Sequence, residues 1–85
     1  MRSFYLLTKS HCPLCTQVIQ LIHQTPLDEP IELGVVDIGT DPDLIEEYAT
    51  LVPVLVRGRD DVELKWPFNP AQLLEFLESW VLFYA

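Results

Sequence analysis

The alternation of apolar and polar residues divides the first half of the chain into two strand-like segments and one helix-like segment. Apolar and aromatic residues dominate Ser3–Thr8 and Ile31–Ile38, and we predict a strand at each. Between them, apolar residues from Val18 to Ile22 recur at helical spacing. Pro13 suits a first helical turn, where its missing N–H is not needed. We therefore predict a helix from about Cys12 to Gln24.

The second half of the chain carries the signals of a short helix followed by a hairpin. Asp41 is a good N-cap and is followed by a proline, which predicts a helix over Pro42–Ala49. Two mostly apolar runs, Val54–Arg57 and Val62–Trp66, flank the turn-forming sequence GRDD. This pattern predicts an antiparallel hairpin.

The sequence Asn69-Pro70 marks the start of a last helix, which we predict over Pro70–Leu82. The element order is then β-α-β-α-β-β-α. The first two strands flank a helix and should be parallel, whereas the hairpin strands are antiparallel. We therefore predict an α/β fold with one mixed four-stranded sheet and three flanking helices. The apolar stripe of the last helix is expected to comprise Leu73, Leu74, Leu77, Trp80, Val81 and Tyr84.

Length and charge limit the classes of function. The chain has 85 residues, the size of one domain, and we treat residues 1–85 as a single domain. Its 13 acidic residues outnumber its 5 Lys and Arg residues, giving a net charge of -8. Binding to nucleic acid or to an anionic membrane needs clustered Lys and Arg, so we expect neither partner. The acidic balance is most simply a feature of solubility, and a basic partner surface is the alternative.

The distribution of apolar residues also bears on location. No stretch approaches the ~18 apolar residues that a membrane span needs, and the apolar run Phe4–Leu7 is too short for a secretory signal. We therefore expect a cytoplasmic protein, in which thiols are kept reduced. A disulfide between residues three apart would also close almost no loop, so a structural role for the two cysteines is unexpected.

The only two cysteines, Cys12 and Cys15, enclose Pro13 and Leu14 at the predicted start of the first helix. A helix start carries free N–H groups and a partial positive charge, which stabilise a thiolate. One sulfur lies at the helix start and the other one turn further in, so the two can close a disulfide. Cys12 is then the expected nucleophile toward a substrate disulfide. Cys15 is the thiol expected to resolve the mixed disulfide.

Other roles for the two cysteines stay open at this point. Zinc needs four ligands, and His23 lies eight residues beyond Cys15, two helical turns away. We predict no metal ligands, and the alternative is a non-enzymatic metal- or cluster-binding or docking module. His11 is either a cation that lowers the pKa of the Cys12 thiol or a simple loop residue. Arg57 and Arg59 either are solvated turn residues or contact an acidic partner or a glutathione carboxylate. Trp66 either packs in the core or shapes a substrate groove.

The segment TKSHCPLC resembles the glutaredoxin motif Lys-x-x-Cys-Pro-Tyr-Cys, with Lys9 three residues before Cys12. A second likeness is LVPVLV, in which Val52-Pro53 matches the cis-proline before the third strand of thioredoxin-fold proteins. The likeness covers the element order of essentially the whole chain and implies a thioredoxin-like fold. The chain more closely resembles the small, acidic glutaredoxin-like proteins of unassigned function than a typical glutaredoxin.

The resemblance also implies roles for individual residues. Cys12 would be the nucleophile and Cys15 the resolving thiol. Pro53 would be cis and face the cysteines, while the backbone of Val52 would pair with a bound substrate chain. Lys9 would hold the Cys12 thiolate or a substrate carboxylate. The residues expected to bind substrate or shape the site are thus Lys9, His11, Pro13, Leu14, Val52 and Pro53.

Two departures from glutaredoxins concern glutathione. Leu14 stands where glutaredoxins usually have Tyr, and KWPFNPAQL replaces the Gly-Gly region that holds the γ-glutamyl end of glutathione. The bulk of Trp66 and the missing N–H of Pro67 argue against that binding site. We predict a monomeric thiol–disulfide oxidoreductase without a resident cofactor, acting on a disulfide-containing protein or on glutathione. Its reductant would be a thioredoxin reductase or the glutathione system.

Overall fold

The structure is a computed structural model that describes residues 2–27 and 29–82, and only the backbone of residues 80–82. The predicted order β-α-β-α-β-β-α is confirmed, with one short 3-10 helix added. The predicted stripe members Trp80, Val81 and Tyr84 lie outside the described side chains. The elements are β1 (Arg2–Thr8), α1 (Pro13–Gln24), β2 (Ile31–Asp37), η1 (Ile38–Thr40), α2 (Pro42–Tyr48), β3 (Val54–Arg57), β4 (Glu63–Lys65) and α3 (Pro70–Leu82).

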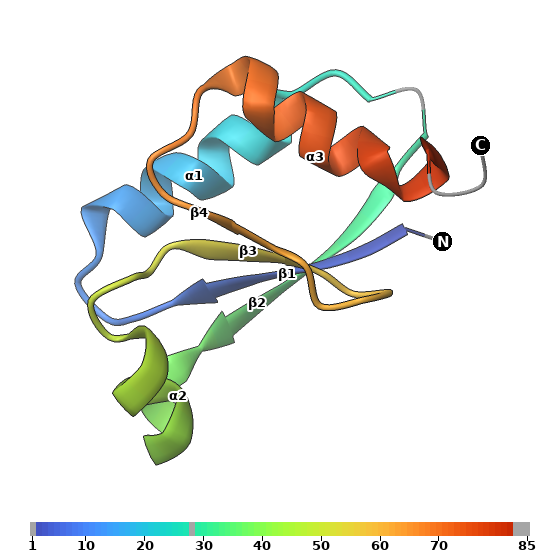
Figure 1. The fold of residues 1–85 in the computed structure, drawn as a ribbon. Coiled ribbons are helices and arrows are strands. Elements are labelled where there is room, and N and C mark those ends of the chain that lie inside the picture. Colours follow the sequence, from blue (N-terminus) through green and yellow to red (C-terminus); the bar gives the residue numbers. More distant parts are fainter. Residues whose placement is uncertain (1, 28, 83–85) are drawn as a thin grey trace.

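The strands form one mixed sheet in the order β2-β1-β3-β4. β1 pairs in parallel with β2 and antiparallel with β3, and β3 pairs antiparallel with β4. These pairings confirm the predicted mixed sheet. Because Leu7 of β1 pairs with Val54 of β3, the segment that leaves β1 and the segment that enters β3 meet at one end of the sheet (Figure 1).

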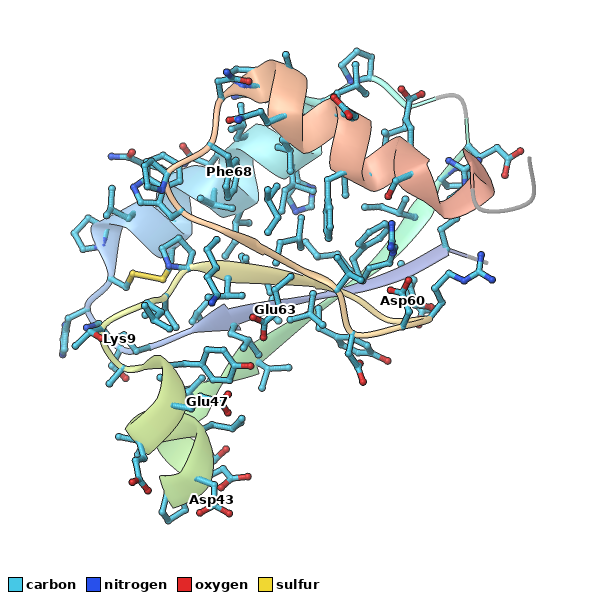
Figure 2. The ribbon with its side chains drawn as sticks, viewed as in Figure 1. Lys9, Asp43, Glu47, Asp60, Glu63 and Phe68 are labelled. Atoms are coloured by element: carbon cyan, nitrogen blue, oxygen red, sulfur yellow. A yellow bond between two sulfur atoms is a disulfide. The ribbon has the colours of Figure 1, made fainter. Side chains whose placement is uncertain are left out.

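Helices cover both faces of the sheet (Figure 1). α1 and α3 lie on one face, whereas α2 and η1 lie on the other face near one end. Neighbouring residues of a strand point to opposite faces, so Leu6 packs under α1 and α3 while Leu7 packs under α2. Figure 2 shows Phe68 between the start of α3 and α1. The larger core comprises Phe4, Leu6, Val18, Ile22, Leu55, Phe68, Leu73 and Leu77.

Local side-chain hydrogen bonds fix the predicted helix starts. The Asp41 carboxylate accepts a hydrogen bond from the Asp43 N–H at 2.9 Å, as an N-cap should. At α3, the Asn69 side chain accepts from the Gln72 N–H at 2.7 Å. The Gln72 side chain in turn accepts from the Asn69 N–H at 2.9 Å. This reciprocal pair is a capping box, which ends the preceding loop sharply.

Two predicted strands are longer than the strands in the structure. Ile38 belongs to η1 rather than to β2, because the Asp37 carboxylate accepts from the Gly39 N–H at 2.8 Å and turns the chain. The predicted strand Val62–Trp66 is shortened to β4, Glu63–Lys65. Lys65 pairs with Val54, the first residue of β3, and Pro53 before it has no N–H to extend the pairing. Within the described ranges, the helices fall short of the length and apolar character needed to traverse a bilayer.

Candidate redox site

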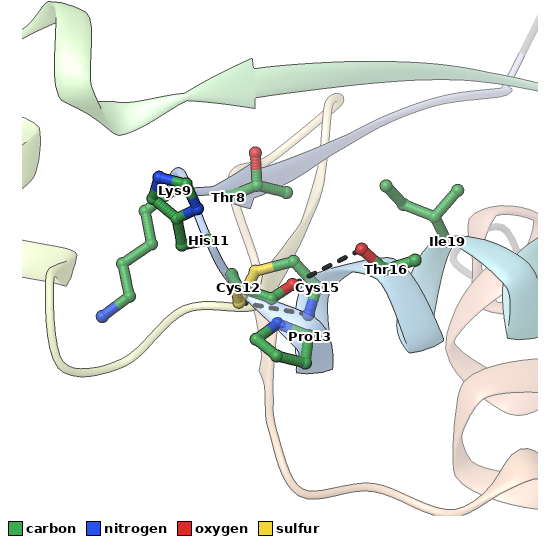
Figure 3. A pocket seen from close by; sticks show the side chains of 8 residues that line it. All are labelled: Thr8, Lys9, His11, Cys12, Pro13, Cys15, Thr16 and Ile19. Atoms are coloured by element: carbon green, nitrogen blue, oxygen red, sulfur yellow. Dashed lines mark hydrogen bonds between the residues drawn. A yellow bond between two sulfur atoms is a disulfide. The ribbon is translucent and has the colours of Figure 1, made fainter.

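The two cysteines lie at the start of α1, where β1 has just ended. Cys12 is the N-cap of the helix and Cys15 lies in its first turn, with their Cα atoms 5.3 Å apart and their sulfurs joined (Figure 3). The Cys15 N–H donates to the Cys12 Sγ at 3.1 Å. Cys12 is half-buried, whereas Cys15 is only 3% exposed. The helix start thus directs a donor to the more accessible of the two sulfurs.

A cavity of about 520 Å³ opens beside this pair (Figure 3). None of its eight lining residues is acidic, although the chain carries 13 acidic residues. The ionisable side chains other than the cysteines are those of Lys9 and His11, so the cavity is locally favourable to negative charge. The lining residues are Thr8, Lys9, His11, Cys12, Pro13, Cys15, Thr16 and Ile19.

Five of the predicted site residues therefore share this cavity, and three do not. Leu14, Val52 and Pro53 lie outside its lining, and Leu14 is 39% exposed on α1. The sequence interpretation missed three lining residues: Thr8, Thr16 and Ile19. For the last two a signal existed, because residues four and seven positions after Cys12 share its helix face.

Lys9 does not contact the cysteines in this structure. Its ammonium donates to the Ala49 carbonyl at 2.9 Å, at the C-terminal end of α2, where a positive charge is favoured. Figure 3 shows the Lys9 side chain extending away from Cys12. The disulfide carries no charge that would attract an ammonium, so the predicted contact with a Cys12 thiolate concerns the reduced protein and stays a prediction.

The Val52–Pro53 peptide bond is cis, as the resemblance implied. Pro53 is buried and precedes β3 at the end of the sheet from which the cysteine segment leaves β1. The Val52 N–H donates to the Tyr48 carbonyl at 3.1 Å. The Val52 N–H could therefore pair with a substrate chain only after this hydrogen bond opens.

The segment that replaces the glutaredoxin Gly-Gly region packs tightly against the sheet. The Trp66–Pro67 bond is also cis, and the Trp66 N–H donates to the Pro53 carbonyl at 3.4 Å. The Trp66 ring is partly buried and meets the Phe68 ring edge-on, with centroids 5.3 Å apart. Of the two interpretations of Trp66, these contacts favour the packing role.

The start of α3 offers few backbone donors to an anionic ligand. Pro67 and Pro70 have no N–H, and the N–H groups of Asn69 and Gln72 are occupied by the capping box. A γ-glutamyl carboxylate would need such N–H groups. The expectation from the sequence that glutathione is not bound there stays a prediction.

Arg57 is a structural cation and fits neither of its predicted roles. Its guanidinium donates to both carboxylate oxygens of Asp60, at 2.9 and 2.8 Å, and to the Ser79 hydroxyl. It also lies 5.7 Å from the centre of the Phe76 ring. The hydrogen bonds from Arg57 lower the pKa of the Asp60 carboxyl. Arg57 thus clamps the hairpin to α3, where it is not free to dock an acidic partner.

The arrangement of possible ligands bears on the metal alternative. Among residues 2–27 and 29–82, no group of three or more His, Cys, Asp or Glu side chains is placed to hold a metal ion. His23 is exposed near the far end of α1, away from the cysteines at its start. The described residues therefore do not gather around Cys12 the four ligands that zinc needs.

Comparison with known proteins identifies the family. The sequence profile of the glutaredoxin-like domain family (DUF836) matches residues 3–78. The chain belongs to this family. Its Cys12–Cys15 pair gives it the CxxC spacing of a redox protein. A search among curated proteins finds no match.

Solved structures of similar shape confirm the predicted thioredoxin-like α/β fold. The chain is 29% identical to Northeast Structural Genomics target protein XcR50 from X. campestris, whose X-ray structure gives a TM-score of 0.76 over 89% of this chain and 96% of that one. The solution structure of XcR50 gives a TM-score of 0.74 and covers 93% of this chain and 95% of that one. The N-terminal domain of Synechococcus elongatus SasA is 21% identical with a TM-score of 0.65, covering 96% and 84%, which is a likeness of fold alone.

Proposed function

We propose that this glutaredoxin-like protein is a thiol–disulfide oxidoreductase. The observation that carries the proposal is the asymmetric pair at the start of α1. Cys12 is the more accessible sulfur and accepts the Cys15 N–H at 3.1 Å, while Cys15 is 3% exposed. The donor and the helix dipole both lower the pKa of the Cys12 thiol in the reduced protein, because they stabilise its anion.

The reaction then proceeds by two exchanges. The Cys12 thiolate attacks a substrate disulfide, forms a mixed disulfide and expels one substrate thiolate. The Cys15 thiolate attacks the Cys12 sulfur, forms the Cys12–Cys15 disulfide and expels the second substrate thiolate. The two electrons gained by the substrate come from the dithiol, and an external thiol or dithiol reductant restores it. No resident cofactor is needed for these steps.

The few free N–H groups at the start of α3 and the packed Trp66 ring support a protein or small-molecule disulfide as substrate over glutathione held in the glutaredoxin manner. Glutathione can still exchange with Cys12 as an ordinary thiol, so the glutathione system and a thioredoxin reductase are both proposed reductants. The charge of -8 supports a partner without an acidic contact surface and disfavours nucleic acid and anionic membranes. We further propose that the protein acts as a monomer in the cytoplasm.

Single cysteine variants test this proposal. With a disulfide-bonded peptide and a dithiol reductant, the wild-type protein should accelerate peptide reduction. Cys12→Ser should abolish the acceleration, and Cys15→Ser should accumulate one mixed disulfide per chain, detected by mass spectrometry. His23→Gln is the matched control and should behave as wild type, since His23 is exposed outside the cavity. Full activity in Cys12→Ser would refute the proposed roles of the two cysteines, whereas a wild-type protein without any activity would direct attention to a docking or metal-binding module.

A further inference from the structure

The start of α1 does not by itself favour ionisation of Cys15, the resolving thiol. Cys15 is 3% exposed, and burial in apolar surroundings raises the pKa of a thiol. Its own N–H is directed to the Cys12 sulfur, so the local donor stabilises the anion of Cys12 and not that of Cys15. The second exchange requires the Cys15 thiolate, and it therefore needs a group that accepts the Cys15 proton.

Among the described residues, few side chains could accept the proton of Cys15. Their buried polar side chains are those of Arg2 and Thr8, so no buried carboxylate lies among them. The cavity beside Cys15 has no acidic lining residue. Of its two basic residues, Lys9 is engaged with the Ala49 carbonyl at 2.9 Å, and a lysine ordinarily stays protonated at neutral pH.

His11 is the remaining basic residue of this cavity. Its backbone adopts a φ of 57°, in the left-handed region, where His is found more often than most residues other than glycine. Its imidazole is exposed beside Cys12 (Figure 3). Such backbone conformations are concentrated at functional sites. An imidazole is the side chain whose ordinary pKa lies close to neutral pH.

The other charged groups around the cavity leave this role to His11. Lys9 lies in the same segment and is held by α2. Asp37 pairs with Thr8 at the end of β2, but its carboxylate is exposed and accepts the Gly39 N–H at 2.8 Å. From α1, the ionisable groups of the cavity are the two cysteines themselves.

We propose that His11 accepts the proton of Cys15 during the resolving step, relayed by water in the cavity. The cavity of about 520 Å³ has ample room for such water. The proton passes from the Cys15 thiol to the imidazole, and the Cys15 thiolate attacks the Cys12 sulfur of the mixed disulfide. The new Cys12–Cys15 bond forms as the bond to the substrate sulfur breaks, and the imidazole then passes the proton to water, or to the departing thiolate where that thiolate is basic enough to accept it. This inference rests on the proposed function and assigns a proton acceptor to its second step.

Reaction of the reduced protein with an aromatic disulfide that releases a coloured thiolate separates the two steps. Attack by Cys12 releases the first thiolate and resolution by Cys15 the second, so stopped-flow absorbance resolves two phases. The variants are His11→Ala and His11→Gln, with His23→Gln as the matched control. Positioned proton transfer contributes about 10²–10⁴-fold to a rate. We therefore expect the second phase to slow at least ~10-fold at pH 7 in both His11 variants, and to slow more than the first phase.

Two further readouts distinguish proton transfer from a structural role. In the wild type the second phase should accelerate as pH rises through the range in which imidazole titrates, and in His11→Ala this rise should shift to the higher range of a thiol. Added imidazole should restore part of the second phase in His11→Ala. Equal slowing of both phases, or an unchanged second phase, would overturn the inference while leaving the dithiol mechanism in place. Absence of both phases in the wild-type protein would instead overturn the proposed function.

Discussion

Removing the hydroxyl of Tyr48 should weaken the connection between α2 and the edge of the sheet. The Tyr48 hydroxyl donates a hydrogen bond to the Glu63 carboxylate of β4 (Figure 2 labels Glu63). Tyr48 also holds the cis-proline segment, because its carbonyl accepts the Val52 N–H at 3.1 Å. The substitution Tyr48→Phe removes the hydroxyl and retains the ring, so it tests the hydrogen bond alone.

The expected loss of unfolding free energy in Tyr48→Phe can be estimated from the pKa of the Tyr48 phenol. The hydrogen bond to Glu63, followed by burial, raises the pKa of Tyr48 to about 12. A rise from about 10 corresponds to at most ~2.7 kcal/mol, at 1.36 kcal/mol for each pH unit. Tyr48 is half-buried, so solvent screening reduces this figure, and a net value of about 1–2 kcal/mol agrees with hydrogen bonds to charged acceptors.

Urea unfolding monitored by circular dichroism measures the effect. At pH 7 we expect Tyr48→Phe to lose about 1–2 kcal/mol of unfolding free energy. The matched control is Tyr5→Phe, which should change it by less than ~0.5 kcal/mol. Tyr5 is 44% exposed, and its hydroxyl makes no hydrogen bond within the described residues.

The pH dependence gives a second test of the same bond. Because the pKa is higher in the folded state, the stabilisation is fully present below about pH 10 and is lost as pH rises toward about 12. The difference between the wild type and Tyr48→Phe should therefore shrink over this range. Equal stability of Tyr48→Phe and Tyr5→Phe at pH 7 would refute the reasoning.

Two further predictions concern a pair of glycines and the N-cap of α3. Gly58→Ala would place a Cβ 2.7 Å from the Ser3 carbonyl oxygen, which accepts the Gly58 N–H at 2.8 Å, and should lose about 1–3 kcal/mol. Gly39→Ala, whose Cβ would meet only a side-chain oxygen at 3.0 Å, should lose less, and the reverse order of urea midpoints would contradict this account. Asn69→Ala removes the capping box with Gln72 and should lose about 1 kcal/mol, whereas Asn69→Asp should retain most of it. Equal urea midpoints for these two variants would contradict the assigned cap.

The local parts of the fold and site could be predicted from the sequence. The Cys12–Cys15 spacing, the cap at Asp41 and the Asn69-Pro70 start all depend on residues within one or two turns of each other. The cis-proline at Pro53 was predicted because its sequence setting matches a known family. In each case the signal and the structure it specifies lie in the same short segment.

Contacts between distant segments could not be predicted in this way. Lys9 donates to the carbonyl of Ala49, forty residues away in the chain, a contact that the motif around Cys12 does not indicate. Arg57 was expected to be solvated or to dock a partner, but it clamps Asp60 and the α3 residue Ser79. A pattern of residue types records which side chains are charged, and it does not record which carbonyl or carboxylate the folded chain brings to them.

The measurement that tests the central claim most directly is a redox titration of the purified protein in glutathione buffers, with thiols counted by alkylation and mass spectrometry. We predict a reversible two-electron transition in which Cys12 and Cys15 form one intramolecular disulfide. Cys15→Ser should instead show only a one-thiol transition with a glutathione adduct on Cys12. Failure to form the Cys12–Cys15 disulfide at any potential, or a mass that fits a bound metal, would contradict the account.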